Sequence, residues 1–177
     1  MREEDAVADF ERASGDAHLL AGDAPVQPLD SFVSATLVAF AEMASTEVAV
    51  RKIYRATLGD SWGDISAVLG IKSTTEGMLL LRFPERTAAA IAQRVLADTE
   101  VELNESLIRD CVGEIANVIA GQAKTLLAGT PYRLTFSLPE VVVGKHLLSR
   151  PEWSRECLVI AFRSDLGEFS LGLALQQ

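Results

Sequence analysis

The chain is poor in the residues that most metal, redox and disulfide sites require. Its two cysteines, Cys111 and Cys157, match no paired spacing, so a disulfide scaffold is excluded and a reducing, cytoplasmic compartment is expected. Its two histidines, His18 and His146, lie far apart and fit no Cys/His ligand spacing, which argues against a metal site in this chain. The sequence also lacks a phosphate-binding Gly-rich loop and the Gly-x-Ser-x-Gly motif of many hydrolases.

Long hydrophobic runs and basic residues are scarce as well. No apolar stretch approaches the ~20 residues that a membrane span needs, and the first residues do not form a secretory signal pattern. The chain has only 16 Lys and Arg but 25 Asp and Glu, which gives a formal net charge of −9. Because nucleic acids and anionic membranes require basic patches, we expect neither as a ligand, whereas the net charge is compatible with partners that expose Lys or Arg.

The acidic residues are concentrated near the N-terminus. Residues 1–28 hold seven acids and two arginines, a net charge of −5, and they end in Pro25 and Pro28. A segment this acidic and poor in aromatics buries too little surface to fold, so we interpret residues 1–28 as a flexible extension. Residues 29–177 then form a single domain, because a chain of 177 residues supports one good core and is short for two.

Hydrophobic periodicity predicts an α+β fold for this domain. Apolar residues at helical spacing predict two long helices, about 30–47 and 105–128, and a shorter helix at about 85–97. Strands are expected over residues 47–58, 64–71, 77–83, 132–136, 141–143, 156–162 and 169–175. Because helices and strands occur in separate runs, we expect the helices to pack on one face of a mainly antiparallel sheet. Each half has a long helix followed by a strand and a strand pair, which hints at an internal duplication.

The second long helix carries a polar stripe. At 100° per residue, its members fall within roughly 80° of one another, whereas most of the apolar residues lie on the opposite side. The stripe consists of Asp110, Glu114, Asn117, Gly121 and Lys124. A polar stripe is most often a solvated helix face, and that interpretation stays open here.

Two glycines favour a functional interpretation of this stripe. Gly113 and Gly121 flank Glu114 and Asn117, and each costs about 1 kcal/mol of helix stability relative to alanine. Small residues allow another backbone to approach closely. The approaching chain is either a partner protein or a neighbouring element of the same domain, and the sequence leaves both open.

The chemistry of the stripe points to a labile phosphoryl group on another protein. Asn117 has no useful pKa and is no general base, but its carboxamide can hydrogen-bond a water and orient its attack. Orientation suffices for an activated substrate such as an aspartyl phosphate, much as a glutamine orients water in GTPases. Glu114, one helical turn away, can pair with a lysine of the partner.

These residues form a recognisable signature. The pattern Asp110-x3-Glu114-x2-Asn117-x21-Pro139 resembles that of the CheC/CheX/FliY family of chemotaxis phosphatases, and the similarity runs from about residue 30 to 175. CheC and FliY carry two such sites. The first long helix here offers only Asp30-x3-Ser34-x2-Leu37 in that place, so the single site is most similar to CheX.

The resemblance implies an enzyme that hydrolyses the aspartyl phosphate of a CheY-like response regulator. It implies that Glu114 docks to the regulator's active-site lysine and that Asn117 orients the attacking water. The required Mg²⁺ is then held by the regulator, and a homodimer paired through its sheets is expected. The remaining partner-binding candidates are Asp110, Gly113, Gly121 and Lys124. The alternative is a non-catalytic module that binds phosphorylated receiver domains or a flagellar motor component with the same face.

Overall fold

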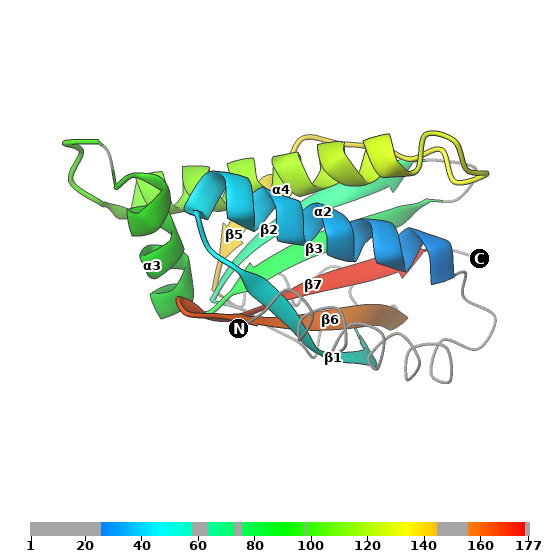
Figure 1. The fold of residues 1–177 in the computed structure, drawn as a ribbon, viewed down its shortest axis with the longest axis horizontal. Coiled ribbons are helices and arrows are strands. Elements are labelled where there is room, and N and C mark those ends of the chain that lie inside the picture. Colours follow the sequence, from blue (N-terminus) through cyan, green and yellow to red (C-terminus); the bar gives the residue numbers. More distant parts are fainter. Residues whose placement is uncertain (1–25, 58–63, 73–75, 98, 145–155, 176–177) are drawn as a thin grey trace.

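The computed structural model of the chain describes residues 26–57, 64–72, 76–97, 99–144 and 156–175 (Figure 1). Most of the predicted acidic extension, residues 1–25, lies outside these ranges. None of the helices in these ranges combines the length and the hydrophobicity that a membrane-spanning helix requires.

A seven-stranded sheet forms the base of the fold. All of its strand pairs are antiparallel, and the α+β prediction is confirmed. In spatial order the strands are β1 (Val48–Thr57), β6 (Glu156–Ser164), β7 (Gly167–Leu175), β3 (Gly77–Phe83), β2 (Ile65–Lys72) and β4 (Thr135–Phe136), and β5 (Glu140–Val143) also pairs with β2.

Three helices of the described ranges lie against this sheet. The two long helices, α2 (Val26–Ala44) and α4 (Glu105–Leu126), pack side by side on one face, and α3 (Glu85–Val95) covers one end (Figure 1). Helix α4 lies over β2 and β5, whereas α2 contacts β1. Asn104 caps α4, because its side-chain oxygen accepts a hydrogen bond from the Leu107 amide at 3.1 Å.

The sheet order reveals a duplicated arrangement. Each half of the chain contributes a long helix and a hairpin, β2–β3 in the first half and β6–β7 in the second, and the two hairpins meet where β3 pairs with β7. The outer strands are exchanged: β1 pairs with β6 of the second half, and β4 and β5 pair with β2 of the first. The halves are therefore interleaved in one sheet.

The predicted limits of α2 were wrong at both ends. The helix begins at Val26, within the predicted extension, and Pro28 is accommodated because the first helical turn needs no amide donor there. It ends at Ala44 and does not reach residue 47. Ser45 adopts the left-handed conformation (φ 45°), and the Thr46 amide bonds back to the Phe40 carbonyl at 3.3 Å.

An aromatic cluster joins α2 to the sheet. The ring of Phe40 stacks on that of Phe169 with centroids 4.4 Å apart, and Phe162 and Phe83 lie 5.1 and 5.2 Å from Phe169. All four side chains are buried. Each such pair adds about 0.5–1.5 kcal/mol beyond the burial of its area. The cluster holds the helical layer on the sheet and so fixes the platform on which α4 lies.

Candidate functional site on helix α4

Helix α4 presents the predicted stripe to solvent. Its inner face is buried in the core through Val112, Ile115 and Ile119, each 1% exposed or less. The five stripe residues, Asp110, Glu114, Asn117, Gly121 and Lys124, are all exposed. The predicted separation of a core face and a polar face is confirmed. Glu114 and Asn117 lie nearly one turn apart on the same side of a rigid helix, where a partner can reach both.

Gly121, within the stripe, and Gly113, beside it, have different surroundings. Gly113 is buried, and a Cβ built on it would lie 3.2 Å from Val141 Cγ2 and 3.9 Å from Pro139 Cγ. Its small size therefore serves packing of α4 against the β5 segment, which favours the second of the two interpretations that the sequence left open, a neighbouring element of the same domain. Gly121 is exposed, and a Cβ there would meet nothing within 4 Å. Among the residues that the structure describes, no packing contact explains that glycine.

Pro139 borders the stripe on its Gly113 side. It belongs to a short irregular segment, residues 137–139, that separates β4 from β5. Because Phe136 pairs with Ile71 and Glu140 pairs with Val68, three residues of this segment face two residues of β2, which is a β-bulge. The bulge brings Pro139 against α4, 3.9 Å from the position that a Cβ on Gly113 would take.

Leu138, which precedes this proline, is not among the site residues predicted from the sequence. Leu138 is 85% exposed, more than any other large apolar residue among those that the structure describes. A leucine directly before a proline, between two short strands, is the only sequence signal that points to it.

Cys111 lies on the core side of α4 and is no nucleophile candidate. Its side chain is 8% exposed, and burial raises the pKa of its thiol to about 11. The thiol therefore stays protonated at neutral pH and acts as a small apolar filler.

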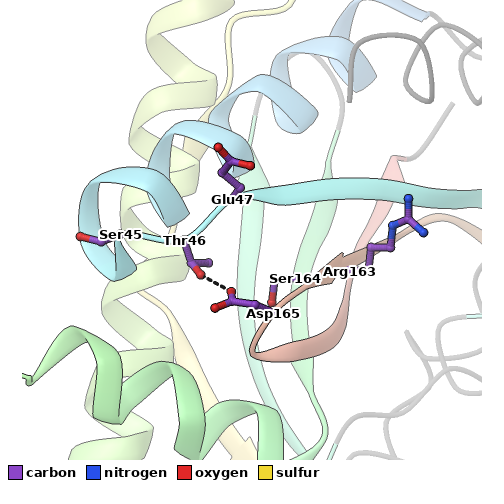
Figure 2. Close-up of a pocket in the computed structure, with 6 residues that line it drawn as sticks. All are labelled: Ser45, Thr46, Glu47, Arg163, Ser164 and Asp165. Atoms are coloured by element: carbon purple, nitrogen blue, oxygen red, sulfur yellow. Dashed lines mark hydrogen bonds between the residues drawn. The ribbon is translucent and has the colours of Figure 1, made fainter. Parts of the chain in front are cut away.

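A polar hollow of about 440 Å³ lies away from α4, among the residues that the structure describes. It lies where the end of α2 meets the β6–β7 turn, and Figure 2 shows the Thr46 hydroxyl pointing at Asp165. Hydrogen bonds from Thr46 and then Arg94 lower the pKa of the Asp165 carboxyl. These contacts tie the α2–β1 turn and α3 to the β6–β7 turn, and we assign the hollow a structural role.

Metal ligands do not gather among the described residues. No group of three or more His, Cys, Asp or Glu side chains there is arranged to hold a metal ion. Both histidines, His18 and His146, lie outside the described ranges. The stripe itself offers carboxylates only from Asp110 and Glu114.

Comparison with known proteins identifies the family. The family model for "Chemotaxis phosphatase CheX" matches residues 65–163, more than half of the 177-residue chain, and the matched range includes Glu114, Asn117 and Pro139. A search of curated proteins finds no significant match.

Solved structures share the fold over almost their whole length. CheX from Desulfovibrio desulfuricans is 26% identical, with 84% of this chain and 99% of that chain covered and a TM-score of 0.73. CheX from Vibrio vulnificus is also 26% identical, with 85% and 97% covered and a TM-score of 0.70. The CheX–CheY–BeF₃–Mg²⁺ complex from Borrelia burgdorferi matches at 18% identity, with 84% and 97% covered and a TM-score of 0.64, and shows a common fold. The chain therefore belongs to the CheX family of chemotaxis phosphatases.

Proposed function

We propose that this chain hydrolyses the aspartyl phosphate of a CheY-like receiver domain. In this proposal Asn117 orients the attacking water and Glu114 pairs with the receiver's active-site lysine. The observation that carries it is the joint exposure of these two side chains on one face of α4. The exposed Gly121, with open space where a Cβ would lie, supports the approach of another protein to the same face.

The reaction requires little from the phosphatase beyond the positioning of the attacking water. The water oxygen attacks phosphorus, the bond between phosphorus and the aspartyl oxygen breaks, and inorganic phosphate and a free carboxylate result. The acyl phosphate is already a good leaving group, so a carboxamide that fixes the line of attack can accelerate the step without taking up a proton. Asn117, on a capped and well-packed helix, meets that requirement.

Charge supports the choice of partner. Glu114 can pair with a lysine ammonium, and removal of water at the interface strengthens such a pair. Asp110 and Lys124 lie further along the same stripe and are proposed as contacts at its two ends. The Mg²⁺ that the reaction needs is assigned to the receiver, because receiver carboxylates can hold it beside the phosphoryl group.

The Borrelia burgdorferi complex adds a physical precedent for the partner. In it a CheX is bound to CheY with BeF₃ and Mg²⁺, and the beryllofluoride stands in for the phosphoryl group. That protein shares the fold of this chain, and its partner supports a CheY-like receiver as the partner that we propose for the α4 face here.

A non-catalytic module that binds phosphorylated receivers or a motor component is the alternative function. A binding role alone needs a docking residue and does not need a water-positioning carboxamide. Because both Glu114 and Asn117 are present and exposed, we favour the enzyme.

Phosphate release from a phosphorylated cognate receiver tests this proposal. Asn117→Ala should slow the accelerated reaction on the order of 100-fold, because the water loses its orientation, while binding is retained. Glu114→Ala should weaken both binding and turnover. Gln93→Ala and Glu42→Ala are matched controls, because they remove the same groups from exposed helical positions off α4. If the wild-type chain binds the phosphorylated receiver without shortening its lifetime, the binding-module alternative is correct.

We also propose that the chain forms a homodimer. We propose a cytoplasmic location as well, because receiver domains act in the cytoplasm. Strand β1 lies at one edge of the sheet and is ten residues long, so it offers backbone groups for pairing with a second copy. Light scattering of the purified chain tests the dimer, and a monomeric mass at micromolar concentration would rule it out.

A further inference from the structure

The bulge between β4 and β5 decides which side chain faces α4. In a regular strand alternate residues share a face, so Leu138 would follow Phe136 toward the helices. Phe136 does face that side, where its ring packs edge-on against Phe32 with centroids 6.2 Å apart. The extra residue of the bulge places Pro139 against α4 instead and leaves Leu138 exposed.

The bulge is held firmly. The Ser137 amide donates to the Gly70 carbonyl at 2.9 Å, and the Gly70 amide donates to the Ser137 hydroxyl oxygen at 2.9 Å. The same hydroxyl donates to the Leu138 carbonyl at 3.0 Å. With the backbone fixed on both sides of Leu138, its side chain is held outward at little entropic cost.

The position of Leu138 is next to the proposed catalytic stripe. Pro139, its neighbour, packs on Gly113, and Gly113 lies four residues before Asn117 on the same helix. Single exposed leucines are common on protein surfaces and need no explanation. This one differs because a braced bulge turns it away from the core beside the stripe. Bulges often reorient a side chain next to an active site.

We propose that Leu138 is a hydrophobic anchor that seats the receiver domain beside Glu114 and Asn117, and this inference rests on the proposed function. The receiver surface that it contacts is therefore expected to be apolar and to lie near the phosphorylated aspartate. The anchor is continuous with the stripe, so one partner covers both. Leu138 then governs how tightly the receiver is held, and it takes no part in orienting the water.

The same change from leucine to serine, made at position 138 and at a control position, tests the anchor. Leu138→Ser should raise the KM for the phosphorylated receiver about tenfold, the loss expected for an apolar contact at an interface, and leave kcat within about twofold. Leu138→Met should restore most of the affinity. Leu126→Ser is the matched control: Leu126 is 50% exposed and lies about 160° around α4 from Asp110, away from the stripe.

A direct binding measurement separates this inference from the proposed function. Titration with the beryllofluoride-loaded receiver reports affinity even if the chain has no phosphatase activity. Weaker binding by Leu138→Ser than by Leu126→Ser supports the anchor. Equal affinity of the two variants overturns it, whatever the phosphatase assay shows. A change in oligomeric mass with Leu138→Ser also overturns it, because Leu138 would then lie between copies of this chain.

Discussion

Replacement of Gly121 by alanine tests whether the open side of α4 is kept clear for a partner. Position 121 is inside a 22-residue helix, where glycine costs about 1 kcal/mol relative to alanine. A Cβ there meets nothing within 4 Å, so no contact offsets the gain. We therefore expect Gly121→Ala to raise the free energy of unfolding by nearly 1 kcal/mol and the Tm by about 2–4 °C.

Gly113→Ala is the comparison within the same helix. Its propensity gain is the same, but the new Cβ would lie 3.2 Å from Val141 Cγ2, closer than a relaxed contact. Val141 or the β5 backbone must shift by a few tenths of an ångström, so we expect Gly113→Ala to stabilise the chain less than Gly121→Ala, or to destabilise it.

Urea unfolding followed by circular dichroism measures both variants, and phosphate release from a phosphorylated receiver measures the functional effect. Gly121→Ala should raise the KM for the receiver while it stabilises the fold. A loss of stability in Gly121→Ala would refute the structural argument. A stabilised variant with an unchanged KM would instead refute the role of Gly121 in docking, while the open space around Gly121 would still explain the gain in stability.

Two further predictions concern titratable groups. Because Thr46 and Arg94 hold the pKa of Asp165 below its ordinary value, the stability that this carboxylate contributes is present above its unfolded-state pKa. This contribution to stability is lost as the pH falls through the lowered native pKa. Urea unfolding between pH 7 and 3 should therefore show a shallower loss of stability for Asp165→Asn than for the wild-type chain. Identical pH profiles of the two proteins would contradict this linkage. With its pKa raised to about 11, the buried Cys111 thiol should resist iodoacetamide at pH 8 until the chain unfolds, and rapid labelling of the native protein, read by mass spectrometry, would contradict its burial.

The helix that carries the site could be predicted well because several local signals agree there. Asn104 supplies the cap, and the apolar residues repeat at helical spacing, so the start of α4 and its exposed face both follow from the sequence. The predicted strands were also confirmed over most of β1, β2 and β3, where β-branched residues and turn signals coincide. These features depend on neighbours within a few residues of one another.

Features that depend on distant contacts could not be predicted. The burial of Gly113 depends on Val141 and Pro139, which reach it only through the pairing of β5 with β2. One extra residue in an edge strand changes no hydrophobic pattern, so the bulge and the exposure of Leu138 could not be predicted from the sequence. The early end of α2 depends on Ser45, whose left-handed conformation is unusual for a residue other than glycine.

The interleaving of the two halves makes the molecule divisible into pieces that function only together. A cut in the connector between α3 and α4, between the exposed Glu100 and Val101, would separate β1 from its partner β6. It would also separate α4 and the Pro139 bulge from β2, which supports both. Neither fragment can build a continuous sheet alone. The chain is therefore a natural scaffold for a split reporter, in which recovered receiver binding signals that two fused proteins have met.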